Sequence, residues 1–411
     1  MRQTSLWLGG VALGLVVATG AIPHGHTPID SRWNFNEHLF PVFAERCGGC
    51  HIDGGVAPMS LVDYQSAFPW TQSIREEILG LRMPPWQAED EFGGFRNGHS
   101  LSAQEMNMIL EWSSGGYPQG PRDLAPEPPT PLETWSLGDP TLVLQMPEPF
   151  DLDAGTSETV RYFVLPSGVS EARSILGAEV SPGARAVVRG AAVFVDDTGT
   201  ARSLDEADEG PGFAQTPDLS FPTAPPVAVW SPGQPSVLSR DYGYVLPTGA
   251  DVVLRIHYKK TWITEGVDFS DQSQVGLHLS DGRVTDIASM VVASPTEMSG
   301  GAATFTHEMT SDVTVLALFP EVDIEASELV IEAKRPDGER VPMLWLREPD
   351  RGWPTRFWFD APLLLPAGTE LEVTTRIDAG AERLLGGTLI GEESAPIRLA
   401  VAYVNEPPAA D

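Results

Sequence analysis

The chain has 411 residues, with 26 basic residues against 57 acidic ones and a formal net charge of -31. This length is too great for one ordinary domain and predicts two or three. The strong negative charge excludes nucleic acid and anionic membrane surfaces as expected partners, because both repel an acidic protein.

The N-terminus predicts an export signal. Arg2 is followed by an uncharged, largely apolar run that ends in small residues at positions 18–21. A basic start, a short apolar core and small residues at its end are typical of a secretory signal peptide, which we place at residues 1–22. The run is nearly long enough to span a bilayer, so an uncleaved anchor is the alternative. Either way, the sequence predicts a periplasmic or extracellular protein.

Residues 33–116 have a helical spacing of apolar side chains, with one helix before residue 47 and another over residues 64–81. A third helix opens with Ser102 and Glu105 in a capping-box pattern and stops at Gly115. Three short helices predict a small all-α domain, with a prosthetic group supplying much of its apolar core. We place this domain at residues 31–117.

The only two cysteines of the chain lie in the motif Cys47-Gly48-Gly49-Cys50-His51. Two thiols at this spacing can capture both vinyl groups of a haem as thioethers, while the next imidazole reaches the iron. A redox dithiol would not need the histidine, and a zinc site would need a second pair of ligands. A structural disulfide would close too short a loop to stabilise the chain much. The motif therefore predicts one covalently bound haem c.

The second iron ligand of such a haem is commonly a methionine thioether. Met83 precedes two prolines that stiffen the chain, and it is the first candidate. Met59 is the runner-up, followed by His99 and by an iron whose second axial position stays open. The expected haem-binding residues are Cys47, Cys50, His51 and Met83, the last two as iron ligands.

A proline-rich segment at residues 118–135 predicts an extended linker, after which the pattern changes. Short β-type runs are separated by Gly, Pro and Asp turns, without helical stretches between them. This pattern predicts antiparallel sandwiches or jelly rolls, and the length suits two of them, at residues 136–283 and 284–406. The runs are Thr141–Gln145, Val160–Leu165, Ala186–Val195, Val252–His257, Val313–Phe319, Leu329–Ala333, Glu370–Ile377 and Ile397–Val404.

Several motifs together resemble a known family. They are Cys47–His51, Ala57–Leu61, Arg82–Trp86, Pro140–Leu144 and Met146–Phe150. The chain is similar to bacterial exported proteins that fuse a cytochrome c domain to a module like the copper type II, ascorbate-dependent monooxygenases, the relatives of peptidylglycine and dopamine hydroxylases. In that family, two jelly-roll domains each hold one copper. The resemblance implies an all-α cytochrome c domain followed by two all-β jelly-roll domains.

The copper ligands of that family are largely substituted. Arg189 and Gly190 stand where the first domain has adjacent histidines, and only its third ligand remains, as His257. Glu321 and Asp323 replace the His-x-His pair of the second domain, and its C-terminal methionine has no counterpart. Redox-active copper prefers imidazole and thioether ligands to carboxylates. The resemblance therefore implies a degenerate module in which we do not expect copper.

Three functions stay open at this point, and so does the question of whether the chain is an enzyme. The first is an exported electron carrier with one haem, whose β-rich module serves docking or binds something other than copper. The second is an active copper monooxygenase in which Glu321 and Asp323 act with His278 or His307. The third is a structural subunit of a surface or periplasmic complex. Because the helical segment is acidic, its redox partner is expected to be neutral or basic.

Overall fold

The computed structural model describes residues 30–89, 92–127, 129, 135–216, 219, 221–298, 300–350, 352–378, 389–390 and 395–405. The predicted signal peptide at residues 1–22 lies outside these ranges, as does part of the predicted linker at residues 118–135. The chain is mostly β, with 38% of its residues in strands and 15% in helices. Among the described helices, none has the length and apolarity needed to span a membrane.

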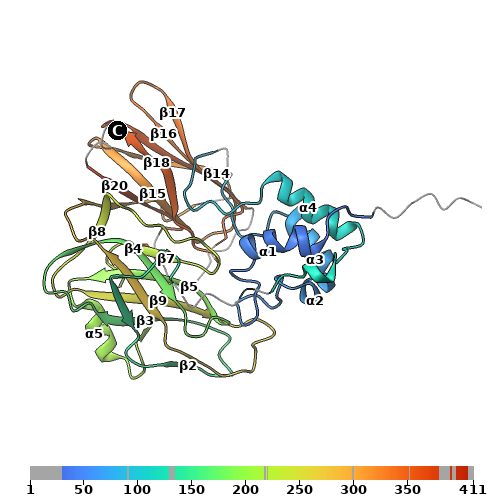
Figure 1. The fold of residues 1–411 in the computed structure, drawn as a ribbon. Coiled ribbons are helices and arrows are strands. Elements are labelled where there is room, and N and C mark those ends of the chain that lie inside the picture. The colour runs from blue at the N-terminus through green and yellow to red at the C-terminus, as the bar shows by residue number, and fades with distance from the viewer. Residues whose placement is uncertain are drawn as a thin grey trace, which may run out of the picture.

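The helices near the N-terminus lie beside a larger β-rich body (Figure 1). Their small core is aromatic, with Phe35, Phe43 and Trp112 each at most 1% exposed. The capping box at Ser102 and Glu105 is confirmed. The helical elements are η1 (Phe35–Leu39), α1 (Phe40–Arg46), α2 (Tyr64–Ala67), η2 (Phe68–Trp70), α3 (Thr71–Leu79), α4 (Ala103–Ser114), η3 (Arg122–Leu124) and, in the β-rich body, α5 (Thr200–Ala207).

The predicted fold class, an all-α cytochrome c domain followed by two jelly rolls, is wrong. The helices are short parts of a mostly β chain, and residues 84–98, here called the strap, leave them to join a β-sandwich. Two prolines open the strap and Gly93-Gly94 interrupts it, so it cannot continue a helix. Its apolar side chains, Trp86, Ala88 and Phe95, pack into the core of that sandwich instead. The described residues therefore show no cytochrome c fold.

Backbone and side-chain hydrogen bonds fix the strap to the sandwich. Ala88 forms a β-bridge with Leu346, and Phe95 forms one with Phe359. The buried Asn97 side chain donates from Nδ2 to the carbonyl of Arg356 at 2.7 Å and accepts from the amide of Trp358 at 3.2 Å. Residues that the sequence assigns to the helical segment thus complete a β structure.

The β-rich body begins with a sandwich of two five-stranded sheets around one apolar core. All neighbouring strands are antiparallel except β12 and β8. In spatial order, the first sheet contains β1 (Leu142–Gln145), β11 (Gln274–Leu279), β4 (Arg173–Ser181), β8 (Tyr242–Leu246) and β12 (Thr285–Asp286). The second contains β6 (Phe213–Ala214), β3 (Glu158–Pro166), β9 (Asp251–Lys259), β5 (Val188–Asp196) and β7 (Ala228–Trp230), and β2 (Phe150–Leu152) pairs separately with β10 (Phe269–Asp271).

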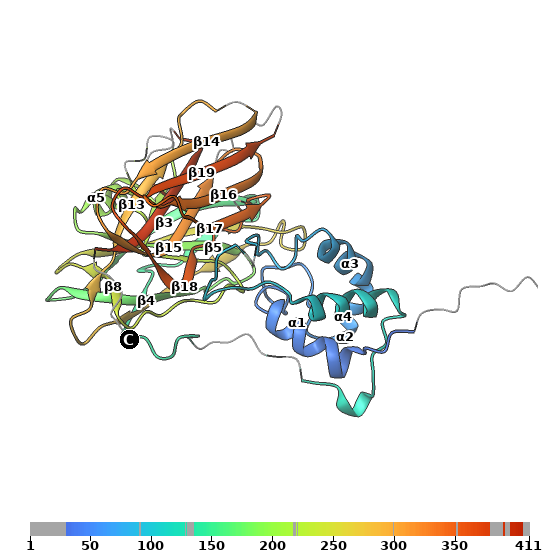
Figure 2. The same ribbon diagram turned by 90° about the horizontal axis from the view of Figure 1, so that it is seen from above.

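A second sandwich follows, made of two four-stranded antiparallel sheets. It lies above the first in Figure 1, and the view from above in Figure 2 places the helices to one side of both. One sheet contains β13 (Ala288–Ala293), β20 (Ile397–Val404), β15 (Val313–Val322) and β18 (Phe357–Leu365). The other contains β14 (Gly301–Glu308), β19 (Glu370–Ile377), β16 (Ala326–Lys334) and β17 (Arg340–Arg347).

Strand β9 is buried on both faces because the two sandwiches pack against each other. Successive side chains of a strand point to opposite faces. Leu254 and Ile256 belong to the core of the first sandwich, whereas Val253 packs in a cluster that includes Phe319 of β15. Arg255, His257 and Lys259 continue the face of Val253 and line a cavity between the two sandwiches, which is described below.

We expect Phe95→Ala to lower the free energy of unfolding by about 2 kcal/mol, less than a fully buried phenylalanine would, because Phe95 is half-buried. Its ring lies 5.4 Å from that of Phe357 and 5.5 Å from that of Phe359, centroid to centroid. Urea unfolding measures the loss, and hydrogen exchange locates it. Faster exchange in β18 is expected. An increase confined to the helices would contradict the assignment of the strap to the sandwich. The exposed Leu124→Ala is the control, with an effect within about 0.5 kcal/mol.

Candidate functional site

A cavity of about 150 Å³ lies between the helices and the first sandwich, and we call it the motif cavity. Its floor is apolar, with Phe43, Leu61 and Ile74 from the helical core. All haem-binding residues expected from the sequence line it, together with the two lower-ranked candidates for the second iron ligand. They are Cys47, Cys50, His51, Met83, Met59 and His99.

The end of α1 delivers the cysteine motif to this cavity. Cys47 caps the helix, and its amide donates to the carbonyl of Phe43 at 3.0 Å. The two glycines between the thiols allow close contacts on either side. A Cβ atom on Gly48 would lie 2.6 Å from the carbonyl oxygen of Ala44. One on Gly49 would lie 2.4 Å from the Cα of Gly233, in the first sandwich. The motif thus packs between the end of α1 and the loop of the first sandwich that contains Gly233.

His51 is held with one ring nitrogen available. Its Nδ1 lies 3.1 Å from the carbonyl oxygen of Met59. Because a carbonyl can only accept, Nδ1 carries the proton of this hydrogen bond, and Nε2 keeps its lone pair. Burial lowers the pKa of His51, although the bond to Met59 acts in the opposite direction. A neutral imidazole oriented by a backbone carbonyl is the usual state of a histidine that binds a metal.

Both cysteines are free thiols. Burial raises the pKa of Cys47 and of Cys50 to about 12, so both are protonated near neutral pH. The Cys50 thiol donates to the carbonyl of Pro232 at 3.2 Å. A redox dithiol needs an accessible thiolate with a lowered pKa, so this environment does not favour a redox dithiol.

The donors around the motif cavity suit a covalently attached haem. Two thiols, a neutral imidazole and a thioether converge on one apolar space, which is the combination that such a group requires. The enclosed volume of about 150 Å³ is below the roughly 300–1,000 Å³ of typical small-molecule sites. The donor set therefore fits a haem, whereas the space between the donors, as the structure shows it, is smaller than a macrocycle needs.

A second and larger cavity, of about 930 Å³, lies between the two sandwiches, and we call it the cleft. It is lined by Arg189, Gly190, His257 and Glu321, four of the five positions that the resemblance compares with copper ligands. Gly190 of β5 is paired directly with His257 of β9, and a bulge beside it turns Arg189 toward the cleft. The fifth position, Asp323, follows the end of β15 and is outside the lining.

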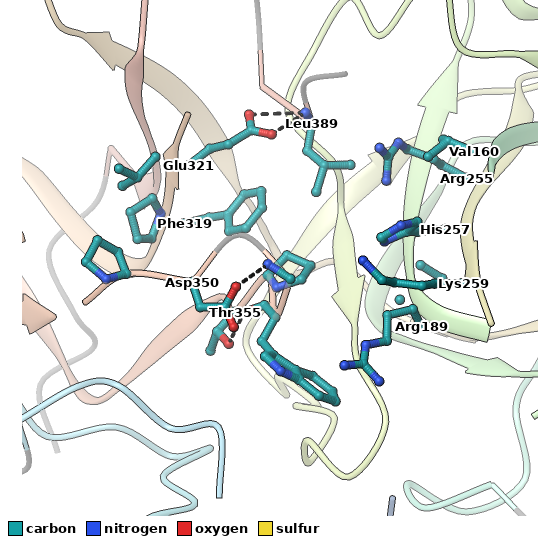
Figure 3. A pocket seen from close by; sticks show the side chains of 18 of the residues that line it. Val160, Arg189, Arg255, His257, Lys259, Phe319, Glu321, Asp350, Thr355 and Leu389 are labelled. Carbon is teal, nitrogen blue, oxygen red and sulfur yellow. Dashed lines mark hydrogen bonds between the residues drawn. The ribbon is translucent and has the colours of Figure 1, made fainter. Parts of the chain in front are cut away.

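Cationic and anionic side chains face one another across the cleft (Figure 3). His257 is hydrogen-bonded through Nε2 to Glu158 at 2.7 Å, and Lys259 lies 3.0 Å from the same carboxylate. Burial lowers the pKa of His257, and the bond to Glu158 opposes this shift. Glu158 thus compensates the charged end of β9 on one wall.

Arg398 binds Glu321 and Asp323, the two carboxylates that the resemblance compares with a His-x-His pair. This side chain is 1% exposed and pairs with Glu321 at 3.0 Å and with Asp323, which are 7% and 4% exposed. Glu321 also accepts from the amides of Leu389 at 2.8 Å and Ile390 at 3.1 Å. Burial alone would lower the pKa of Arg398, but the two carboxylates raise it. The three charged groups form one buried ion network.

The residues suggested for an unconventional copper site do not meet. His278 lies in β11, where its Nε2 is 3.4 Å from Glu179, and His307 is exposed on β14. Neither lines the cleft with Glu321. Within the described ranges, no group of three or more His, Cys, Asp or Glu side chains could hold a metal ion.

Three residues of the site are missing from the sequence-based prediction. Arg255 and Arg398 each interrupt a buried, apolar strand, and a lone charge in such a run is the signal that could have identified them. Trp353 lies on a loop and lines both cavities, as Arg189 does. Nothing in the sequence around Trp353 indicates this position.

Comparisons with known proteins leave the family open. No family model and no curated protein matches the chain. Among solved structures, the major capsid protein P2 of bacteriophage PM2 aligns over 66% of this chain and 99% of its own, at 8% identity and a TM-score of 0.29. The PBCV-1 virus capsid aligns over 64% and 93%, at 8% identity and a TM-score of 0.23. A Paenibacillus xanthan lyase aligns over 68% and 28%, at 11% identity and a TM-score of 0.16. Such low scores carry no functional argument.

We expect Arg398→Met to lower the free energy of unfolding by about 3–5 kcal/mol, because it removes a buried cation that pairs with two buried carboxylates. Adding Glu321→Gln and Asp323→Asn to this variant should recover most of the loss. Urea unfolding of the three proteins measures both steps. A triple variant as unstable as Arg398→Met would contradict the charge-based explanation.

The matched control is Arg340→Met. Arg340 also pairs with two carboxylates, Glu332 and Glu372, but its side chain is 45% exposed. Solvent screens such a network, so the expected loss is about 0–1 kcal/mol.

Proposed function

We propose that this protein carries one covalently bound haem and transfers single electrons. The haem is attached through Cys47 and Cys50, with His51 and Met83 as the iron ligands. The observation that carries this proposal is the convergence of both thiols, His51 and Met83 on one apolar cavity, with the Nδ1 of His51 engaged by a backbone carbonyl.

When bound, the haem supplies an iron that changes its oxidation state by one electron. The chain contributes the environment. The carbonyl of Met59 orients His51, and Phe43, Leu61 and Ile74 keep water away from the ligands. A thioether ligand and an apolar surrounding both favour a relatively high reduction potential.

The β-rich body is proposed to be a degenerate relative of copper type II, ascorbate-dependent monooxygenases. The cleft supports this, since four of the five aligned positions line it and Gly190 is paired with His257. The carboxylates of Glu321 and Asp323 are both engaged by Arg398, an ion pairing that competes with metal binding. We therefore prefer electron transfer to copper-dependent hydroxylation. Export to the periplasm or cell exterior follows from this proposal, because haem c is attached outside the cytoplasm, and a neutral or basic redox partner fits the acidic surface.

Expression in a host that attaches haem c tests this function. We expect the full-length chain to hold one haem that survives denaturation, seen as a pyridine haemochrome and by mass spectrometry. Cys47→Ser with Cys50→Ser should abolish covalent attachment. If the full-length chain purified from this host carried no covalently bound haem, the proposal would be wrong.

The axial ligand is tested separately. We expect Met83→Ala to lower the reduction potential and to open the iron to added imidazole or carbon monoxide, because the thioether is lost. Met59→Ala is the matched control, since it removes a thioether from the same cavity and keeps the carbonyl that orients His51. Redox titration and absorption spectra provide the measurements. If only Met59→Ala opened the iron, Met59 would be the ligand and Met83 would not.

A further inference from the structure

The cleft has the dimensions of a ligand site, and electron transfer through the motif cavity does not account for it. Its volume of about 930 Å³ lies within the range of roughly 300–1,000 Å³ that small-molecule sites occupy. It is bounded by β3, β5 and β9 of the first sandwich and by β15 and residues 349–350 and 352–355 of the second.

One wall of the cleft is cationic because of the alternation along β9. Arg255, His257 and Lys259 are two residues apart and therefore share a face, and Arg189 of β5 lies beside them (Figure 3). Glu158 already binds His257 and Lys259. The charges of the two arginines remain to be compensated.

Neither arginine pairs with a carboxylate in the described part of the chain. Arg255 is 7% exposed, and its Nε donates to the hydroxyl of Tyr162 at 3.3 Å. Arg189 lies over the ring of Trp353, 4.5 Å from the centroid. In a chain with 57 acidic and 26 basic residues, a buried guanidinium without an acidic partner is unexpected. Burying such a charge costs several kcal/mol unless an anion accompanies it.

The remaining lining of the cleft indicates which chemical groups the ligand has besides its anionic group. Its carboxylate Glu321 is engaged by Arg398 and two backbone amides, and Asp350 accepts from the amide of Gly352 at 2.6 Å. Between the walls lie aromatic and aliphatic side chains. Those that line the cleft are Val160, Phe319, Leu346, Trp353, Phe357 and Leu389. An anionic group would meet the arginines, and an apolar body would meet these side chains.

We propose that the cleft binds an organic anion, namely a carboxylate with an aromatic or other apolar body. Arg255 and Arg189 bind the carboxylate, because a guanidinium presents two parallel N–H donors that match its two oxygens. The apolar lining buries the rest of the molecule.

Isothermal titration of the full-length chain at low ionic strength tests this site with three probes of one shape, benzoate, benzamide and benzylamine. We expect benzoate to bind at one equivalent, at least ten-fold more tightly than benzamide, and benzylamine not to bind. Affinity for benzoate should fall as salt is added. Equal binding of benzoate and benzamide, or no binding of benzoate, would overturn the proposal.

Substitutions locate the binding. Arg255→Met should weaken benzoate binding at least ten-fold, while Arg255→Lys, which keeps the charge, should weaken it less. Arg189→Met, at a half-buried position, gives an independent test if Arg255→Met does not fold. Arg32→Met is the control, because this side chain is 74% exposed and lies in the helical segment. Unchanged affinity in folded Arg255→Met and Arg189→Met proteins would refute the site. Arg255 lines the cleft and not the motif cavity, so the result for Arg255→Met tests the cleft separately from the electron-transfer function.

Discussion

The burial of β9 on both faces is the constraint on which the arrangement of the molecule depends. A strand in the middle of a single sandwich, as β9 is in its sheet, would expose the side chains of its outer face to water. Here Leu254 and Ile256 fill the first core, and Val253 packs toward Phe319 of the second sandwich. The side chains that continue the face of Val253 must then be charged residues in a narrow space, and that space is the cleft. The same face of β9 therefore contributes both to the packing between the sandwiches and to the charged lining of the cleft.

Sequence patterns predict elements well where burial is local. The run Val252–His257 lies within β9, and Ile397–Val404 is β20, because a strand buried on both faces consists of consecutive apolar residues. The capping box at Ser102 is also local and was predictable. The cysteine motif and the nearby methionines are predicted to converge, and the structure places them around one cavity.

What the sequence does not reveal depends on contacts between distant residues. The strap looks like a loop within a helical domain, because Trp86 and Phe95 find their partners, Phe357 and Phe359, far along the chain. Without those partners, the pattern gives no reason to place residues 84–98 in a β-sandwich. Likewise, Glu321 and Asp323 look like candidate ligands until Arg398 is seen to lie opposite Glu321 in the register of β15 and β20. The function of a charged residue follows from its neighbours in space.

Alternation along a strand also explains how such a body can lose metal ligands and remain folded. Side chains on one face of β9 and β5 build the core, while those on the other face line the cleft, so the two sets can change independently. Under the proposed relationship to copper monooxygenases, replacement of imidazoles by Arg189, Glu321 and Asp323 leaves the core untouched. The new charges still have to be compensated, since a buried ion without a partner is costly. Arg398 does this for the carboxylates from within the chain, whereas the arginines on the other wall have no such residue in the part of the chain that the structure describes. Under the proposal for the cleft, a bound organic anion compensates these arginines in the way that Arg398 pairs with the carboxylates.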